Sequence, residues 1–127
     1  MRIKIKPDKN KANSLRNMAE LTLQRLEKTD QEKYATNTLT DYYDIIHKLM
    51  EAISLLNGIK IKGDGAHQQL IDYLKEIGII NESTRIFLQD LREKRNRVSY
   101  EGLMIRPEYI KSNKERIISL IKRLNEK

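Results

Sequence analysis

The sequence contains no cysteine, no tryptophan, two prolines and a single phenylalanine among its 127 residues. Without cysteine the chain has no disulfide, thiol nucleophile or cysteine-ligated metal site, so a reducing, cytoplasmic setting is expected. The uninterrupted apolar runs are only a few residues long, whereas a membrane-spanning helix needs about 20 apolar residues. The start, Met1–Pro7, is basic but has no apolar core, so no secretory signal is predicted. We expect a soluble protein that does not partner a membrane, with a basic leader over residues 1–8 and one helical domain over residues 9–127.

The positive charge is concentrated at the two ends of the chain. The formal net charge is +7, made up of +5 over residues 1–16, −4 over residues 17–91 and +6 over residues 92–127. Basic end segments attract polyanions through phosphate contacts and counterion release, which makes nucleic acid the leading partner class. An acidic protein surface is the other candidate. A lysine-rich surface that only keeps the protein soluble is the third interpretation.

Apolar residues recur at spacings of three and four through most of the chain, which is typical of helices with one buried face. Asp64 is a suitable N-cap, and the brief alternation at residues 59–62 is interpreted as a loop because no partner strand is evident. The expected fold class is all-α, a bundle of four longer helices and one short connecting helix. These helices are expected over residues 9–27, up to Asn57–Gly58, from Asp64 to Gly78, from Asn81 to Gly102, and from Pro107 onward.

Two histidines and two adjacent tyrosines are the other candidates for chemistry. Asp44 and His47 are spaced by one helical turn and could share a face as two metal ligands. No third ligand is evident, so we predict no metal and no cofactor, and an exposed or hydrogen-bonded His47. Tyr42 and Tyr43 lie among apolar neighbours, and we predict that both belong to the core.

The densest cluster of polar residues lies at the end of the fourth helix. Arg92, Asn96 and Tyr100 are spaced by four, and Arg95 follows Arg92 by three, so one polar stripe is expected beside the apolar one. A guanidinium matches a phosphate with two parallel hydrogen bonds, which makes Arg92, Arg95 and Arg97 candidate nucleic-acid-binding residues. The alternative is a solvated basic helix end, where cations are favourable in any case.

The segment 95–102, Arg-Asn-Arg-Val-Ser-Tyr-Glu-Gly, resembles the HEPN superfamily. The hallmark of that family is an Arg, often followed by Asn, and then a His a short gap later. The stretch from Asn57 to Leu74 is also similar to stand-alone prokaryotic HEPN proteins in the same place. The resemblance covers roughly residues 9–124 and implies a HEPN-like bundle, commonly a homodimer in which the helices bearing this motif face each other.

The resemblance implies RNA binding, and in many members metal-independent RNA cleavage in toxin–antitoxin, defence or RNA-processing systems. Arg95 would hold the scissile phosphate, with Asn96 as its polar partner. The position of the family's His is Tyr100 in this chain, and no histidine follows residue 67. Asp44 is a candidate for the polar residue of the second helix that approaches the motif. The catalytic candidates are thus Arg95, Asn96 and Tyr100.

The resemblance leaves alternatives open. Tyrosine, with a pKa of about 10, is poorly matched to general base work at neutral pH unless cations lower that pKa. The runner-up is a non-catalytic HEPN module that binds nucleic acid or a small nucleotidyltransferase. The third interpretation is a helical protein whose basic ends bind an acidic protein partner.

Overall fold

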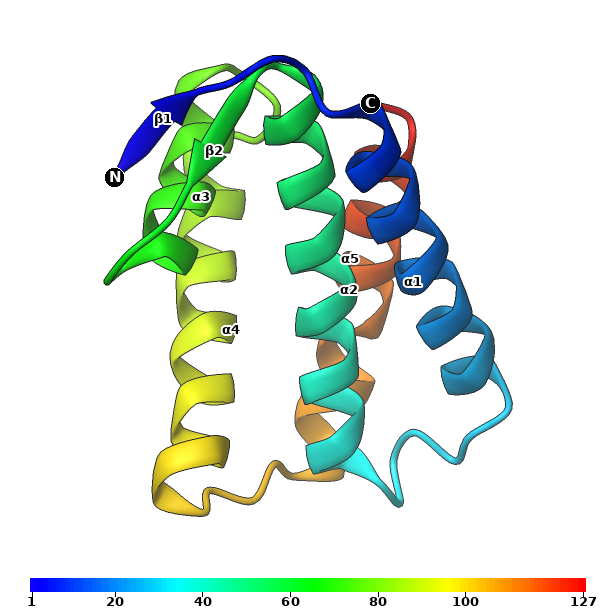
Figure 1. The fold of residues 1–127 in the computed structure, drawn as a ribbon. Helices are drawn as coiled ribbons and strands as arrows, with labels where there is room; N and C mark the ends of the chain where they lie inside the picture. The colour runs from blue at the N-terminus through cyan, green and yellow to red at the C-terminus, as the bar shows by residue number, and fades with distance from the viewer.

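The computed structural model describes all residues from 1 to 127 and confirms the predicted all-α fold class, a bundle of five helices (Figure 1). The first helix begins and ends at the two predicted residues. None of the helices is both long and apolar enough to cross a membrane. The helices are α1 (Lys9–Glu27), α2 (Ala35–Leu56), α3 (Ala66–Glu76), α4 (Glu82–Glu101) and α5 (Pro107–Asn125).

Helix α2 is the centre of the bundle and packs against the other four helices, with α1 and α4 on either side of it in Figure 1. Thirteen of its 22 residues are buried, which explains why apolar residues occupy most of its turns. Tyr42 and Tyr43 are both buried there, as predicted. All five helices contribute to one hydrophobic core of 25 buried residues, so the bundle is a single packed unit.

The predicted loop at residues 59–62 is wrong, because this segment forms a strand. Strand β1 (Arg2–Lys4) pairs antiparallel with β2 (Ile59–Ile61), with Ile3 opposite Lys60. The partner strand lies in the leader, more than 50 residues earlier in the chain. The tetrapeptide Ile-Lys-Ile-Lys occurs at residues 3–6 and again at 59–62. That repeated alternation of period two was the signal that the two segments could pair.

Most predicted helix ends are confirmed, with one exception. Asn81 accepts a hydrogen bond from the backbone N–H of Thr84 at 2.9 Å, and Pro107 is the first residue of α5. The prediction that Asp64 caps α3 is wrong, because the N-cap residue is Gly65, which makes no side-chain hydrogen bond. Gly65 has a φ of +73°, a left-handed conformation that a glycine adopts readily and an aspartate does not.

Gly58 joins the end of α2 to β2 at the point where the leader crosses. Its φ is +74°, and a Cβ atom at this position would lie 2.8 Å from the carbonyl oxygen of Ile5. We expect Gly58→Ala to lower the free energy of unfolding by about 2 kcal/mol or more, since it adds a backbone clash to the cost of the left-handed conformation. Urea denaturation measures the loss.

Gly78 provides the matched control for this substitution. It has a φ of +82°, but open space surrounds the position where its Cβ would lie. Gly78→Ala should therefore cost only the conformational part, about 1 kcal/mol. Equal losses in the two variants would show that the contact between the leader and Gly58 adds nothing to stability.

Candidate functional site

Three aromatic rings from α2 and α3 are stacked together in the structure. Tyr43 and His47 are one turn apart on α2, and His67 lies in the first turn of α3. The ring centroids of His47 and His67 are 3.9 Å apart with an interplanar angle of 15°. Tyr43 lies 6.0 Å from His67 and 6.2 Å from His47, again nearly parallel. The fold thus brings together the only two histidines of the chain.

A hydrogen bond between Tyr43 and His67 fixes the orientation of the His67 ring. The Tyr43 hydroxyl lies 3.1 Å from His67 Nδ1. Burial raises the pKa of Tyr43 to about 12, so the hydroxyl keeps its proton at neutral pH. A protonated hydroxyl can donate to Nδ1 or accept from an Nδ1–H, and both arrangements fit the distance. The first corresponds to the neutral tautomer with Tyr43 as the donor. In this neutral tautomer the proton of His67 is on Nε2, which leaves an N–H donor available to a ligand.

Both histidines are neutral at pH 7. Burial, together with the nearby His67, lowers the pKa of His47 to about 4. Burial also lowers the pKa of His67, and the positive charges of Arg95 and Arg92 lower it further. An anion bound beside the two arginines would offset their charge and raise the pKa of His67 again.

Arg95 faces into the molecule rather than lying on the predicted polar stripe of α4. Leu88, Leu91, Arg95 and Val98 follow one another at spacings of three, four and three, so Arg95 shares the inward face of the helix. Its side chain is half-buried and forms no ion pair with any carboxylate. Its positive charge lowers the pKa values of Tyr43, His47 and His67, so these three groups lie within its electrostatic reach.

Arg92 is held beside the rings by a connection between α4 and α3. Its Nε donates to the side-chain oxygen of Gln89 at 2.8 Å. The amide nitrogen of Gln89 donates to the backbone oxygen of Gln68 and to the carboxylate of Asp72, each at 3.2 Å. Because Gln68 follows His67 directly, this connection fixes the distance between the arginine and the histidine.

The other predicted residues of α4 lie on different faces of the helix. Tyr100 is five residues beyond Arg95, about 140° round the helix, and its side chain is 84% exposed. Asn96 is half-buried and about 100° from Arg95. Arg97 is exposed, with its Nε 3.6 Å from the carboxylate of Glu101. Within one protomer the structure therefore brings Arg92 and Arg95 to the histidines, and leaves Tyr100 and Arg97 outside.

A cavity of about 150 Å³ adjoins the stacked histidines. Its polar walls include His47, Glu51, Lys60 and His67. The carboxylate of Glu51 lies 3.8 Å from His47 Nε2. Asp44, the other candidate on α2, is bound to Lys48 at 2.6 Å. Its negative charge acts on His47 against the effect of burial.

The prediction for His47 is wrong, since the ring is neither exposed nor well hydrogen-bonded. Its side chain is 18% exposed, and its buried Nδ1 has no hydrogen-bond partner. The His, Asp and Glu side chains form no group of three or more that could hold a metal ion. The stacking of His67 on His47 was missed in the sequence, although a histidine in the first turn of a helix, two residues after Gly65, was the available signal.

Comparison with protein-family models, curated proteins and solved structures finds no match to this chain.

Proposed function

We propose that the protein binds RNA at the cluster formed by Tyr43, His47, His67, Arg92 and Arg95, and cleaves it there without a metal ion. We call these five residues the ring–arginine cluster. The observation that carries this proposal is the half-buried Arg95, which has no carboxylate partner and whose positive charge acts on two neutral, stacked histidines. The HEPN-like order of helices and the Arg95-Asn96 pair support the same class of function.

Binding would use the two arginines and the free N–H of His67. A phosphate stabilises a half-buried guanidinium that has no counter-anion, because two phosphate oxygens accept hydrogen bonds from its planar N–H groups. His67 Nε2 would donate to the same anion. RNA is favoured over a small anion because the chain has a positive net charge and Lys60 lines the adjoining cavity.

Cleavage would use His67, in place of Tyr100, as the side chain that transfers a proton, and it would act on the leaving oxygen. The ribose 2′-oxygen attacks phosphorus while the bond from phosphorus to the 5′-oxygen breaks, which leaves a cyclic phosphate. The attacking hydroxyl loses its proton to water. The bound phosphate offsets the charge of the two arginines, so that His67 is an imidazolium whose Nδ1–H donates to the Tyr43 hydroxyl oxygen. The leaving 5′-oxygen takes the Nε2 proton, which leaves His67 neutral. The two arginines balance the charge that develops on the phosphate oxygens. An imidazolium, whose ordinary pKa is about 6.5, is a much stronger acid than a tyrosine hydroxyl at this step.

Arg95→Ala should weaken RNA binding about tenfold or more, because it removes charge-assisted hydrogen bonds to phosphate. Fluorescence anisotropy with a labelled single-stranded RNA at two salt concentrations measures the change. Arg97→Ala is the matched control, since Arg97 lies on another face of the same helix beside Glu101. Equal weakening by both substitutions would mean that charge alone attracts RNA and that the cluster does not bind it.

A second candidate function is a non-catalytic binding module, and the exposed end of α4 favours it. Tyr100 is 84% exposed, and Met104, just beyond the helix, is 80% exposed. Contiguous apolar patches mark interaction surfaces, and a partner bound at this end of α4 would cover both side chains. A second copy of this chain, in a homodimer with facing α4 helices, or a small nucleotidyltransferase would fit the resemblance. Gel filtration with light scattering, alone and with RNA, distinguishes a dimer from a monomer.

A further inference from the structure

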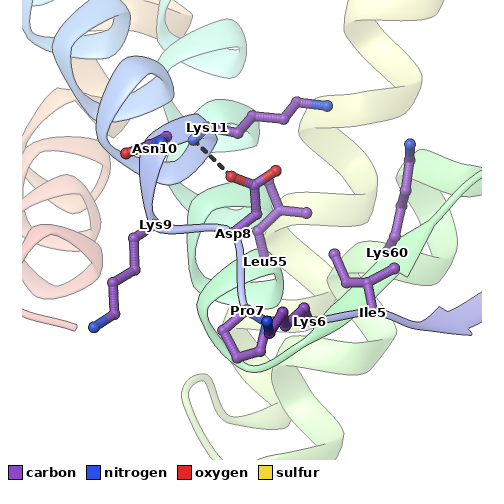
Figure 2. A pocket seen from close by; sticks show the side chains of 9 residues that line it. All are labelled: Ile5, Lys6, Pro7, Asp8, Lys9, Asn10, Lys11, Leu55 and Lys60. Atoms are coloured by element: carbon purple, nitrogen blue, oxygen red, sulfur yellow. Dashed lines mark hydrogen bonds between the residues drawn. The ribbon is translucent and has the colours of Figure 1, made fainter.

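We propose a second RNA contact, at the lysine-lined hollow beside the start of α1, which binds the phosphates of the nucleotides that flank the ring–arginine cluster. This inference rests on the proposed function and extends it to a longer stretch of RNA. The hollow has a volume of about 600 Å³ and lies where the leader, α1 and β2 meet (Figure 2).

Four lysines surround the hollow, and its only carboxylate is already engaged. The lysines are Lys6, Lys9, Lys11 and Lys60. Asp8 accepts a hydrogen bond from the backbone N–H of Lys11 at 3.0 Å and thereby caps α1. Figure 2 shows the side chains of Lys11 and Lys60 extending on the same side of Leu55, while Lys9 extends away from them. The resulting excess of positive charge attracts a polyanion.

The fold assembles this hollow from two distant parts of the sequence. The pairing of β1 with β2 places Lys60 opposite Ile3. Beyond the strands the leader stays attached to the end of α2, since the Ile5 N–H donates to the Gly58 oxygen at 2.9 Å. The Asp8 N–H likewise donates to the Leu55 oxygen at 3.1 Å. Lys6 and Lys60 are therefore held by backbone contacts, so the hollow is a shaped surface.

The hollow is a neighbour of the cavity beside the histidines, and the two share lining residues. Leu55 and Lys60 line both spaces. Glu51 lines the cavity and contacts a lysine of the hollow, with its carboxylate 3.8 Å from His47 Nε2 and 3.7 Å from Lys11 Nζ. A strand whose phosphate is held by Arg95 can therefore continue past Lys60 into the hollow. This adjacency is what makes a flanking RNA segment the occupant.

A second large hollow on the same molecule lacks this charge balance. It has a volume of about 460 Å³, and Lys111 and Lys114 of α5 lie on its wall. Four carboxylates offset those lysines, namely Glu27, Asp30, Glu32 and Glu115. The lysines at the start of α1 have no such neutralisation within their hollow. The α5 lysines thus provide controls of equal charge in a surrounding that should not bind phosphate.

The test compares two triple variants that remove the same charge. One carries Lys6→Gln, Lys11→Gln and Lys60→Gln, and the control carries Lys111→Gln, Lys114→Gln and Lys122→Gln on exposed positions of α5. The probes are a labelled single-stranded RNA of about 12 nucleotides and a trinucleotide, followed by anisotropy at several salt concentrations. The first variant should lose tenfold or more of its affinity for the longer RNA, and the slope of log K against log salt should fall by about 2, since each lost phosphate contact contributes about 0.7.

The trinucleotide should bind the first variant within twofold of the wild type, because it reaches only the ring–arginine cluster. Equal losses in the two triple variants would overturn the inference, as would an equal loss of trinucleotide and longer RNA. Circular dichroism confirms that the first variant is folded. RNA binding by the wild type that Arg95→Ala does not weaken would overturn the proposed function, and a wild type that binds no RNA would overturn both.

Discussion

Replacing His67 with glutamine should lower the rate of RNA cleavage by about 10²–10⁴-fold, the usual contribution of general acid catalysis. Glutamine fills a similar space and can still accept the hydrogen bond of Tyr43, but it cannot give a proton to the leaving oxygen. RNA binding should change little, because Arg92 and Arg95 remain. The measurement uses end-labelled RNA in EDTA and scores fragments that end in a cyclic phosphate.

Tyr100→Phe is the control that distinguishes the two candidate residues, His67 from the structure and Tyr100 from the sequence motif. The Tyr100 side chain is 84% exposed and about 140° round α4 from Arg95, so its hydroxyl should not be required. If Tyr100→Phe abolishes cleavage and His67→Gln does not, the motif position is correct and the ring–arginine cluster is not the active site. RNA that the wild type binds and leaves intact would support the non-catalytic module.

The protein should lose stability in mild acid because of His47. The pKa of this histidine is about 4 in the folded protein and about 6.5 in the unfolded chain, so the unfolded state binds the proton first. Stability is therefore complete above about pH 6.5 and falls as the pH decreases towards 4. From pH 7.5 to pH 5 the loss attributable to His47 is about 2 kcal/mol.

Urea denaturation of the wild type and of His47→Gln at pH 7.5, 6 and 5 measures this contribution. The wild type should lose about 2 kcal/mol more than the variant over that range. His67, whose pKa is also lowered, and the ion-paired Glu76 and Glu82 weaken both proteins in acid. The difference between the two proteins therefore isolates His47. Parallel pH profiles would mean that His47 is protonated in the folded state without cost.

The helices were predictable because their signals are local. The spacing of apolar residues defines α1 from Lys9 to Glu27, and single residues such as Asn81 and Pro107 place the starts of α4 and α5. Each of these effects acts within one or two turns of the chain. The prediction for β2 failed for the opposite reason, since its partner strand lies in the leader, far away in the sequence.

The site was only half predictable, for a similar reason. Arg92 and Arg95 were found from their chemistry, but the side of α4 that each one faces depends on which residues are buried around it. His47 and His67 are 20 residues apart on different helices. Their stacking depends on how α3 packs across α2, which no local pattern encodes. The family resemblance directed attention to Tyr100 at the end of α4, away from the histidine that packing places near Arg95.

The pairing of β1 with β2 has a consequence for the order in which the molecule assembles and opens. The two strands are three residues each and come from segments more than 50 residues apart, so closing them requires a long loop. The helices pack through a core that does not include β1. The leader can therefore detach at a lower free energy than global unfolding, while α2 stays folded. The lysine-lined hollow would then be the last feature to form during folding and the first to be lost.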